Sequence, residues 1–463
     1  MADGEKRKMS LNFSKVLNNL SKHKLAISLL ILLGIFYLSF SVRLATVEQP
    51  HLLAADPHYW YRFTEYIAED NIPEYDPLRL HPDYVTPDIT FFPLTAAYSY
   101  KLAHFFTGIE FYRFLFWFPA FIAALSVFPA FWIGKELYSN KAGLFAAFFI
   151  GLTPSFLSRS MAGFFDTDCM IILLSVLTVA LFLSAYNRID INNFKKKSPI
   201  ILSILTGISL AALSLTWSGG FAYIPWLFIG LFFLHYLYRL VIAKGNNFKE
   251  KLKHSWLFFR NYLLVYIVLF GIFICFTYPL QGFGPLNSIV GVTTFFQTAK
   301  AEGGIFPNVW VSISEEMEAS LTDIIVRIGA PIFFFGFFGI STLLILFLRN
   351  LFSYNKFEGS LLTGLAGFLI LFISVPSMLS ANLFPILIFS FSLSGMLLGL
   401  VIKNKKFYTE TFLFMFIWIA PTLYGSFWAV RFTQMLAIPM AICAGIAFGV
   451  LFDSGIKMIK KYK

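Results

Sequence analysis

Residues 25–42 read LAISLLILLGIFYLSFSV and contain no charged side chain. A helix rises about 1.5 Å per residue, so a stretch of this length spans most of the roughly 30 Å hydrocarbon core of a bilayer. A polar, basic segment, residues 1–24, precedes it, as in a signal peptide, but no small-x-small cleavage site follows. We therefore interpret residues 25–42 as an uncleaved first membrane span.

The composition of the whole chain extends this pattern. Of the 463 residues, 58% are hydrophobic and 13% are charged, whereas soluble domains carry about 25% charged residues. A chain this apolar has too little polar surface to cover a globule in water, which excludes an ordinary soluble protein. The formal net charge is +11, but the basic residues lie between apolar runs, which argues against a nucleic-acid-binding domain.

Apolar runs of about 17–23 residues recur along the chain, each long enough to cross a bilayer as a helix. We predict an all-α, polytopic membrane protein with about twelve transmembrane helices. Residues 91–106 form a shorter run interrupted by Lys101 and His104, which predicts a half-buried or interfacial helix. The predicted spans begin near Leu25, Tyr112, Ala142, Cys169, Ile200, Phe221, Trp256, Ala330, Ser360, Ala381, Tyr408 and Phe432.

The charged loops orient these spans. With residues 1–24 in the cytoplasm, every strongly basic loop and the basic tail 457–463 fall on the cytoplasmic side, as the positive-inside rule expects. The membrane domain then covers residues 25–456, and its two long external loops, at about 46–91 and 281–329, are rich in acidic residues. Long loops in compact proteins tend to be functional or disordered, so we expect the functional face to be external.

Three acidic motifs lie on this external face. They are Asp56, just after the first span, the pair Asp166 and Asp168, after the third span, and Glu315, in the second long loop. Carboxylates that converge near a membrane need a counter-charge. A hard divalent cation such as Mg²⁺ or Mn²⁺ supplies one through oxygen ligands.

Each motif also has a simpler interpretation. Asp-x-Asp segments are common in loops and caps, and an aspartate before Pro57 can cap a helix. Glu315 begins a Glu-Glu-Met-Glu run that is typical of a solvated helix face. The order, spacing and shared side of the three motifs favour the functional interpretation.

Together these residues resemble the catalytic subunit of asparagine-linked oligosaccharyltransferases, a multi-spanning family of the GT-C glycosyltransferase class. Ala162-Gly163-Phe164-Phe165-Asp166-Thr167-Asp168 resembles the second acidic motif of that family and is the most specific match. Asp56-Pro57 resembles the first motif, and Ser312-Ile313-Ser314-Glu315 resembles the motif of the large external loop. Val430-Arg431-Phe432-Thr433 resembles a late segment whose arginine faces the donor diphosphate.

The resemblance implies a chemistry. The family transfers an oligosaccharide from a polyprenyl diphosphate to the Asn side chain of Asn-x-Ser/Thr acceptors, with inversion at the anomeric centre. By position, Asp56, Asp166, Asp168 and Glu315 would surround Mn²⁺ or Mg²⁺, and Asp56 and Glu315 would also contact the acceptor amide. Such an enzyme lies in the plasma membrane of a prokaryote, with its active face outside and both termini of this chain in the cytoplasm.

Two arginines receive roles from the same resemblance. Arg431 would bind the donor diphosphate, and Arg327 would pair with an acidic residue two positions before the acceptor Asn. The simpler interpretations are a snorkelling side chain at the membrane interface for Arg431 and a basic residue at the mouth of a span for Arg327.

The chain departs from the family pattern near its end. Family members continue into a soluble C-terminal domain with a Trp-Trp-Asp motif that holds the sequon Ser/Thr, and this sequence contains no Trp-Trp pair. We expect that domain to be absent, either because it is encoded separately or because the chain is a short relative with a different acceptor. Two other functions stay open: another polyprenyl-sugar-dependent GT-C enzyme acting on lipid or glycan, and, less favoured, a transporter or flippase.

Overall fold

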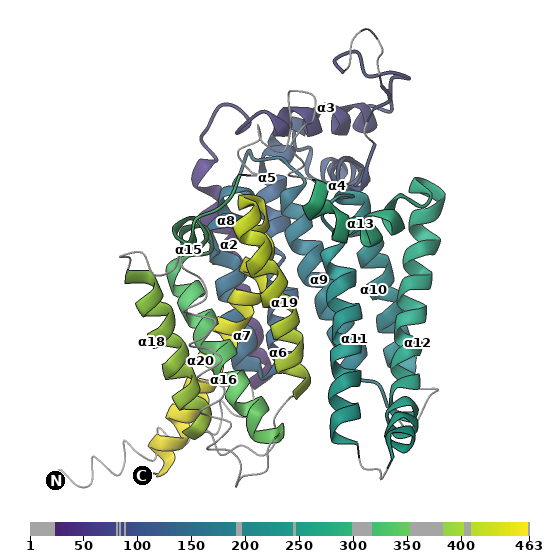
Figure 1. Cartoon of the computed structure of the whole chain (residues 1–463). Helices are drawn as coiled ribbons and strands as arrows, with labels where there is room; N and C mark the ends of the chain where they lie inside the picture. Colours follow the sequence, from purple (N-terminus) through teal and green to yellow (C-terminus); the bar gives the residue numbers. More distant parts are fainter. Residues whose placement is uncertain are drawn as a thin grey trace, which may run out of the picture.

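The computed structural model describes residues 24–461 except 80–81, 83–84, 88, 191–196, 244–246, 299–316, 352–382 and 402–408. Over these residues the chain forms a bundle of long helices that run side by side, with α3, α4 and α13 gathered at one end (Figure 1). The described residues contain no β-strand, only an isolated bridge between Asp76 and Val85. The predicted all-α class is confirmed.

The first half of the chain supplies α2 to α10. Their bounds are α2 (Lys24–Arg43), η1 (Leu44–Thr46), α3 (Asp56–Ala68), α4 (Phe91–Thr107), α5 (Phe111–Ala124), α6 (Val127–Leu137), α7 (Asn140–Leu152), α8 (Pro154–Ser158), α9 (Asp168–Asn187) and α10 (Lys197–Thr216).

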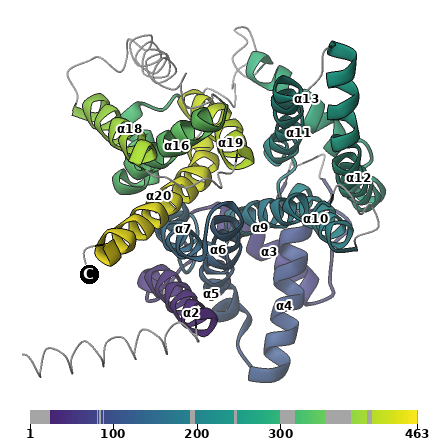
Figure 2. The same ribbon diagram turned by 90° about the horizontal axis from the view of Figure 1, so that it is seen from below.

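The second half supplies α11 to α20. Their bounds are α11 (Tyr223–Ile242), α12 (Phe248–Gln281), α13 (Gly284–Thr298), α15 (Leu321–Ile328), α16 (Ala330–Leu351), α18 (Leu383–Val401), α19 (Thr409–Trp428), η5 (Val430–Phe432) and α20 (Thr433–Lys461). Seen along the bundle, α16, α18, α19 and α20 form one group and α10, α11 and α12 another (Figure 2). α6 and α7 lie beside α20 of the first group, and α9 lies beside α10 of the second.

Nine helical segments among the described residues are long and apolar enough to cross a membrane. They match nine of the predicted spans, which confirms a polytopic membrane protein. The span predicted near Ala381 corresponds to α18, and the one predicted near Ser360 lies outside the described residues. The span predicted near Ala142 is α7, a helix of only 13 residues.

A proline explains why α7 is short. Thr153 has an extended backbone, with φ −60° and ψ 123°, and Pro154 begins α8. Proline disfavours a helical conformation in the residue before it but suits the first position of a new helix. The Thr153 hydroxyl donates to the carbonyl of Phe149 at 2.8 Å, which satisfies one acceptor at the end of α7. The break sends the chain into α8 and then into the second acidic motif.

Small residues let the central helices approach closely. α7 packs against both α6 and α20. A Cβ placed on Gly134 of α6 would lie 2.7 Å from the Cα of Gly143 in α7, and one placed on Gly445 of α20 would lie 2.6 Å from the amide nitrogen of Ala146. Helices in membranes gain little from the hydrophobic effect, so close van der Waals packing of this kind stabilises their association.

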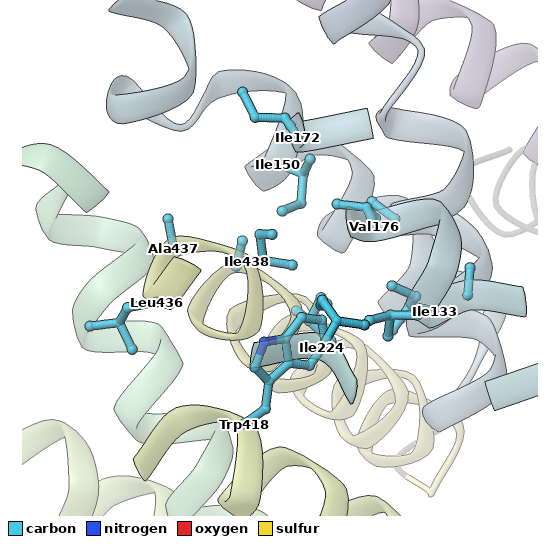
Figure 3. Packing of buried hydrophobic residues seen from close by; sticks show 14 of the residues in the cluster. Ile133, Ile150, Ile172, Val176, Ile224, Trp418, Leu436, Ala437 and Ile438 are labelled. Carbon is cyan, nitrogen blue, oxygen red and sulfur yellow. The ribbon is translucent and has the colours of Figure 1, made fainter. Parts of the chain in front are cut away.

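Branched and aromatic side chains fill the remaining space between these helices. Ile133, Ile150, Val176, Ile438 and Trp418 come from α6, α7, α9, α20 and α19 and are buried together (Figure 3). α9 is buried along nearly all its length. It is therefore a central helix of the bundle.

α4 corresponds to the helix predicted over residues 91–106. It packs against α3 and α5, and it leaves Phe105 and Phe106 largely exposed. Exposed aromatic rings beside Lys101 suit a helix that lies at a membrane interface.

Candidate active site

The loop between α8 and α9, residues 159–167, carries the second acidic motif and is hydrogen-bonded to two earlier segments. The amide of Ala162 donates to the carbonyl of Arg43 at 2.8 Å, at the end of α2. The amide of Leu53 donates to the carbonyl of Gly163 at 2.9 Å. Because Leu53 lies just before α3, this bond ties the segment of the first acidic motif to that of the second.

The side chain of Arg43 strengthens this attachment. It is fully buried, and its Nε donates to Ser160 Oγ at 2.8 Å. Its Nη1 donates to the carbonyl of Gly151 at 2.7 Å and to Ser39 Oγ at 2.6 Å. One guanidinium thus joins α2, the end of α7 and the acidic loop, and a buried arginine with these contacts resists any shift among the three segments.

Gly163 gives the loop its turn. Its φ is +88°, in the left-handed region that favours glycine, and a Cβ there would lie 2.7 Å from the ring of Phe116. The amide of Gly163 also donates to the carbonyl of Phe116 at 2.8 Å. No other residue type combines this conformation with this close approach.

Asp166 and Asp168 are both buried at the start of α9. Asp166 Oδ1 accepts from the Thr167 amide at 2.6 Å and from the Thr167 hydroxyl at 3.1 Å. Burial raises the pKa of Asp166; the Thr167 bonds oppose that rise, and the nearby Asp56 carboxylate adds to it. Asp168 begins α9, where the helix dipole favours negative charge, and its Oδ2 lies 3.9 Å from Arg159 Nη1.

Asp56 is the first residue of α3 and is more exposed than the other two aspartates. The N-cap position belongs to Ala55, which has no side-chain oxygen, so the interpretation of Asp56 as a helix cap is not supported. Its carboxylate acts electrostatically on both Asp166 and Asp168. The structure therefore brings the first and second motifs close together, although they lie far apart in the sequence.

Basic side chains face this acidic cluster. A narrow cleft beside Asp168 is lined by Arg159, Arg327 and Arg431. Arg431 lies on η5, between α19 and α20, and its guanidinium carbon is 5.4 Å from the centre of the Trp217 ring, a cation–π contact. Arg431 also acts electrostatically on Asp168. A side chain in these surroundings is held in the cleft, which argues against simple snorkelling.

Arg327 reaches the same cleft from α15. Ser320 and Asp323 form a capping box at the start of this helix, each side chain bonded to the other's backbone amide. Ile324, Ile325 and Ile328 are buried and fix one face of α15. Arg327 lies on the same helix and lines the cleft.

Glu315, the third acidic motif, lies outside the described residues. The chain becomes described again at Met317, whose carbonyl accepts from the amide of Val430 at 2.9 Å. The amide of Ala319 donates to the carbonyl of Phe427 at 3.3 Å. The segment that follows Glu315 in sequence is therefore anchored beside Arg431.

The aspartates fit a hard divalent cation in kind, because they offer oxygen donors whose mutual repulsion an ion would relieve. However, within the part of the chain that the structure describes, no three His, Cys, Asp or Glu side chains lie close enough together to hold one ion. Glu315 lies outside that part of the chain, so the set of Asp56, Asp166, Asp168 and Glu315 stays a prediction.

The comparison with known families decides what kind of protein this is. Residues 26–463 match the family model described as "Oligosaccharyl transferase STT3, N-terminal". The chain belongs to the STT3 oligosaccharyltransferase family. A similar relative is the dolichyl-phosphooligosaccharide-protein glycotransferase of Methanococcus voltae, 23% identical over 93% of this chain and 47% of that protein.

Solved STT3-family structures share the fold. The archaeal oligosaccharyltransferase AglB from Archaeoglobus fulgidus, in complex with an inhibitory peptide and a dolichol-phosphate, aligns at a TM-score of 0.61 and 17% identity, over 95% of this chain and 52% of that one. An Archaeoglobus fulgidus oligosaccharyltransferase in complex with Zn and sulfate aligns at a TM-score of 0.55 and 18% identity, over 92% of this chain and 49% of that one. The chain spans about half the length of the curated relatives it matches over most of its length.

Three residues of this STT3-family chain contribute to the site although the sequence alone assigns them no role: Arg43, Arg159 and Trp217. Arg159 was visible as a charge in the acidic loop, only nine residues before Asp168. Arg43 looked like an ordinary flanking residue of the first span, and Trp217 looked like one of many aromatic residues. Neither of these two could have been found without the tertiary contacts.

Proposed function

We propose that this chain is the membrane part of an oligosaccharyltransferase, which transfers an oligosaccharide from a polyprenyl diphosphate to the Asn side chain of Asn-x-Ser/Thr. One observation carries the proposal: Asp56, Asp166 and Asp168 gather at the same end of the bundle as Arg159 and Arg431. Carboxylates suit an amide or a cation, and arginines suit a diphosphate.

The acceptor amide is a poor nucleophile in this reaction. The lone pair of an amide nitrogen is delocalised into its carbonyl, so it attacks poorly. Asp56, the more exposed aspartate, and Glu315 would accept hydrogen bonds from the two N–H groups, twist the amide and restore nucleophilic character to the nitrogen. Attack opposite the leaving group then inverts the anomeric centre.

The donor diphosphate leaves as an anion. Arg431, held by the Trp217 ring, and Arg159 can donate to its oxygens and stabilise the charge that develops there. Asp56, Asp166, Asp168 and Glu315 would hold Mn²⁺ or Mg²⁺, which supplies further stabilisation of that charge when bound. The burial of two like-charged carboxylates and the Zn in the Archaeoglobus fulgidus complex support a divalent ion.

Acceptor choice is proposed to depend on Arg327. This side chain lines the cleft next to Arg431, where an acidic residue two positions before the acceptor Asn would meet it.

The proposed setting is the plasma membrane of a prokaryote, with the acidic cluster outside. The basic loops and the basic residues of both termini support a cytoplasmic location for both ends.

The function is tested with the full chain in liposomes, supplied with extracted lipid-linked oligosaccharide, Mn²⁺ and a labelled Asn-x-Thr peptide. Asp166→Asn is expected to lower glycopeptide formation at least about 100-fold, since it removes charge at the reacting centre. Asp453→Asn is the matched control, because Asp453 is a partly buried carboxylate at the far end of α20 that pairs with Lys141. Equal turnover of Asp166→Asn and wild type would refute the role of Asp166.

Donor binding gives a second test that does not depend on binding of an acceptor peptide. Retention of radiolabelled polyprenyl diphosphate donor by the purified chain is expected to weaken about tenfold in Arg431→Gln, for the loss of one charged contact. Donor retention that is the same in both proteins would remove Arg431 from the proposal.

A further inference from the structure

A second polar cavity, of about 360 Å³, lies at the opposite end of the bundle from Asp166 and Asp168. The length of α9 gives the separation between Asp168 and the cavity. Asp168 begins this helix of 20 residues, and Asn187, at its other end, lines the cavity. Such a helix is about 30 Å long. The cavity is therefore a site distinct from the proposed glycosyl-transfer centre.

Two carboxylates line the cavity, and they differ in how well they are paired. Glu136 of α6 is fully engaged: Arg188 Nη2 lies 2.8 Å from its Oε1, and Trp132 Nε1 and Ser184 Oγ each donate to the same oxygen at 3.2 Å. Glu136 therefore joins α6 to α9 and has a structural role of its own.

Glu410, at the start of α19, has much weaker contacts. Among the described residues it meets only Arg239 Nη2 at 3.5 Å and His235 Nε2 at 3.4 Å. That imidazole nitrogen already accepts from Arg239 Nε at 3.2 Å, so it carries no hydrogen for Glu410. The Glu410 carboxylate faces the cavity with unused capacity to accept a hydrogen bond.

Aromatic rings complete the lining on the sides next to Glu410. Tyr186 of α9 and Tyr262 of α12 have ring centres 4.7 Å apart, and Phe414 lies one turn after Glu410 on α19. The Tyr186 hydroxyl lies 2.5 Å from His235 Nδ1. Since Nε2 is the accepting nitrogen, Nδ1 donates to this hydroxyl, and the hydroxyl proton is free to point elsewhere.

A carboxylate beside aromatic faces is the arrangement that recognises an organic cation, through charge and through the ring quadrupoles. We propose that this cavity binds an ammonium group, and that an aminophospholipid headgroup supplies it. The cavity lies where the membrane-crossing helix α9 ends and α19 begins, which is headgroup depth, and Leu183 and Leu231 add apolar wall for the glycerol and acyl region. A soluble amine is the alternative source of the same group.

The test is native mass spectrometry of the full chain in detergent, titrated with phosphatidylethanolamine, with phosphatidylglycerol and, separately, with putrescine. We expect phosphatidylethanolamine adducts that phosphatidylglycerol does not match. Glu410→Gln, which preserves shape and removes charge, is expected to weaken binding about tenfold. Asp453→Asn is the matched control, since it removes a carboxylate at the same end of the bundle that does not line the cavity.

Each outcome has a meaning. Putrescine binding that Glu410→Gln abolishes, without lipid adducts, supports the ammonium site and assigns it to a soluble amine. Equal binding of the two lipids with no putrescine binding, or a Glu410→Gln protein that binds like wild type, overturns the proposal. Should Glu410→Gln unfold earlier than wild type on heating, Phe414→Leu tests the aromatic wall instead, and unchanged binding in that variant also overturns it. None of these results bears on glycosyl transfer, which is measured at the other end.

Discussion

At the scale of single residues, the acidic end depends on backbone conformation as much as on charge. Asp166 and Asp168 follow a loop that turns sharply at Gly163 and is held by the buried side chain of Arg43. Gly163 lies within the second acidic motif and Arg43 lies at the end of α2, yet neither contributes a reacting group. Part of this motif therefore has a conformational role.

Gly163→Ala tests that conclusion. The new methyl group would require a positive φ and would meet the Phe116 ring, so we expect a loss of about 1–3 kcal/mol in unfolding free energy. Thermal unfolding in detergent measures it. Gly34→Ala is the control, because nothing lies within 4 Å of that position in α2 and alanine favours helix there. An unchanged melting temperature in Gly163→Ala would show that the loop can relax.

At the scale of secondary-structure elements, α15 and α20 position two of the three arginines of the cleft, Arg327 and Arg431. α15 carries Arg327 on a helix stabilised at its start by Ser320 and Asp323. α20 follows directly after Arg431 and packs along α7 through glycine contacts. The strength of each element therefore sets how well its arginine is placed.

The cap of α15 is expected to depend on pH. Hydrogen bonds from the Ser320 hydroxyl and amide lower the pKa of Asp323. A group with a lowered folded pKa contributes stability above its unfolded pKa, about 4, and loses it as the pH falls through the folded value. Hydrogen exchange of the α15 amides, corrected for intrinsic rates, should show protection near pH 7 that declines toward pH 3. Asp323→Asn should remove this dependence, and equal pH dependence in that variant would assign it to another group.

The contact between α7 and α20 is expected to be intolerant of bulk. In Gly445→Leu the side chain would meet the backbone of Ala146, so we expect separation of the helices, a loss of about 2–4 kcal/mol and a misplaced Arg431. Gly455→Leu on the same helix has open space and serves as the control. Unfolding and donor retention are measured together; equal behaviour of the two variants would contradict tight packing at Gly445.

At the scale of the whole molecule, the orientation that the basic loops predict agrees with the positions of the acidic cluster and of the Glu410 cavity. The acidic cluster lies at the end of the bundle where α9 begins, and Glu410 with its cavity lies at the end where α9 finishes. Figure 1 shows α3 at the first of these ends. By the positive-inside rule, the basic loop that follows α9 in the sequence predicts a cytoplasmic location for the second end.

Cysteine labelling tests this orientation. In a background with Cys169, Cys275 and Cys443 replaced, Gln49→Cys is expected to react with an impermeant maleimide in intact cells. Lys253→Cys, also at an exposed position, is expected to react only after the membrane is opened. Labelling of both from the same side would overturn the assignment of the acidic cluster to the external face.

The sequence by itself determined the class of protein, nine confirmed spans, the acidic motifs and the family. These follow from hydropathy, charge and short motifs, which are local properties that need no knowledge of the fold. Only the tertiary structure decided that α7 ends before Pro154, that Arg43 holds the acidic loop, that Asp56 is no cap and that Arg159 joins Arg431 in one cleft. Burial and pairing depend on contacts between residues far apart in the chain, and no local pattern records those contacts.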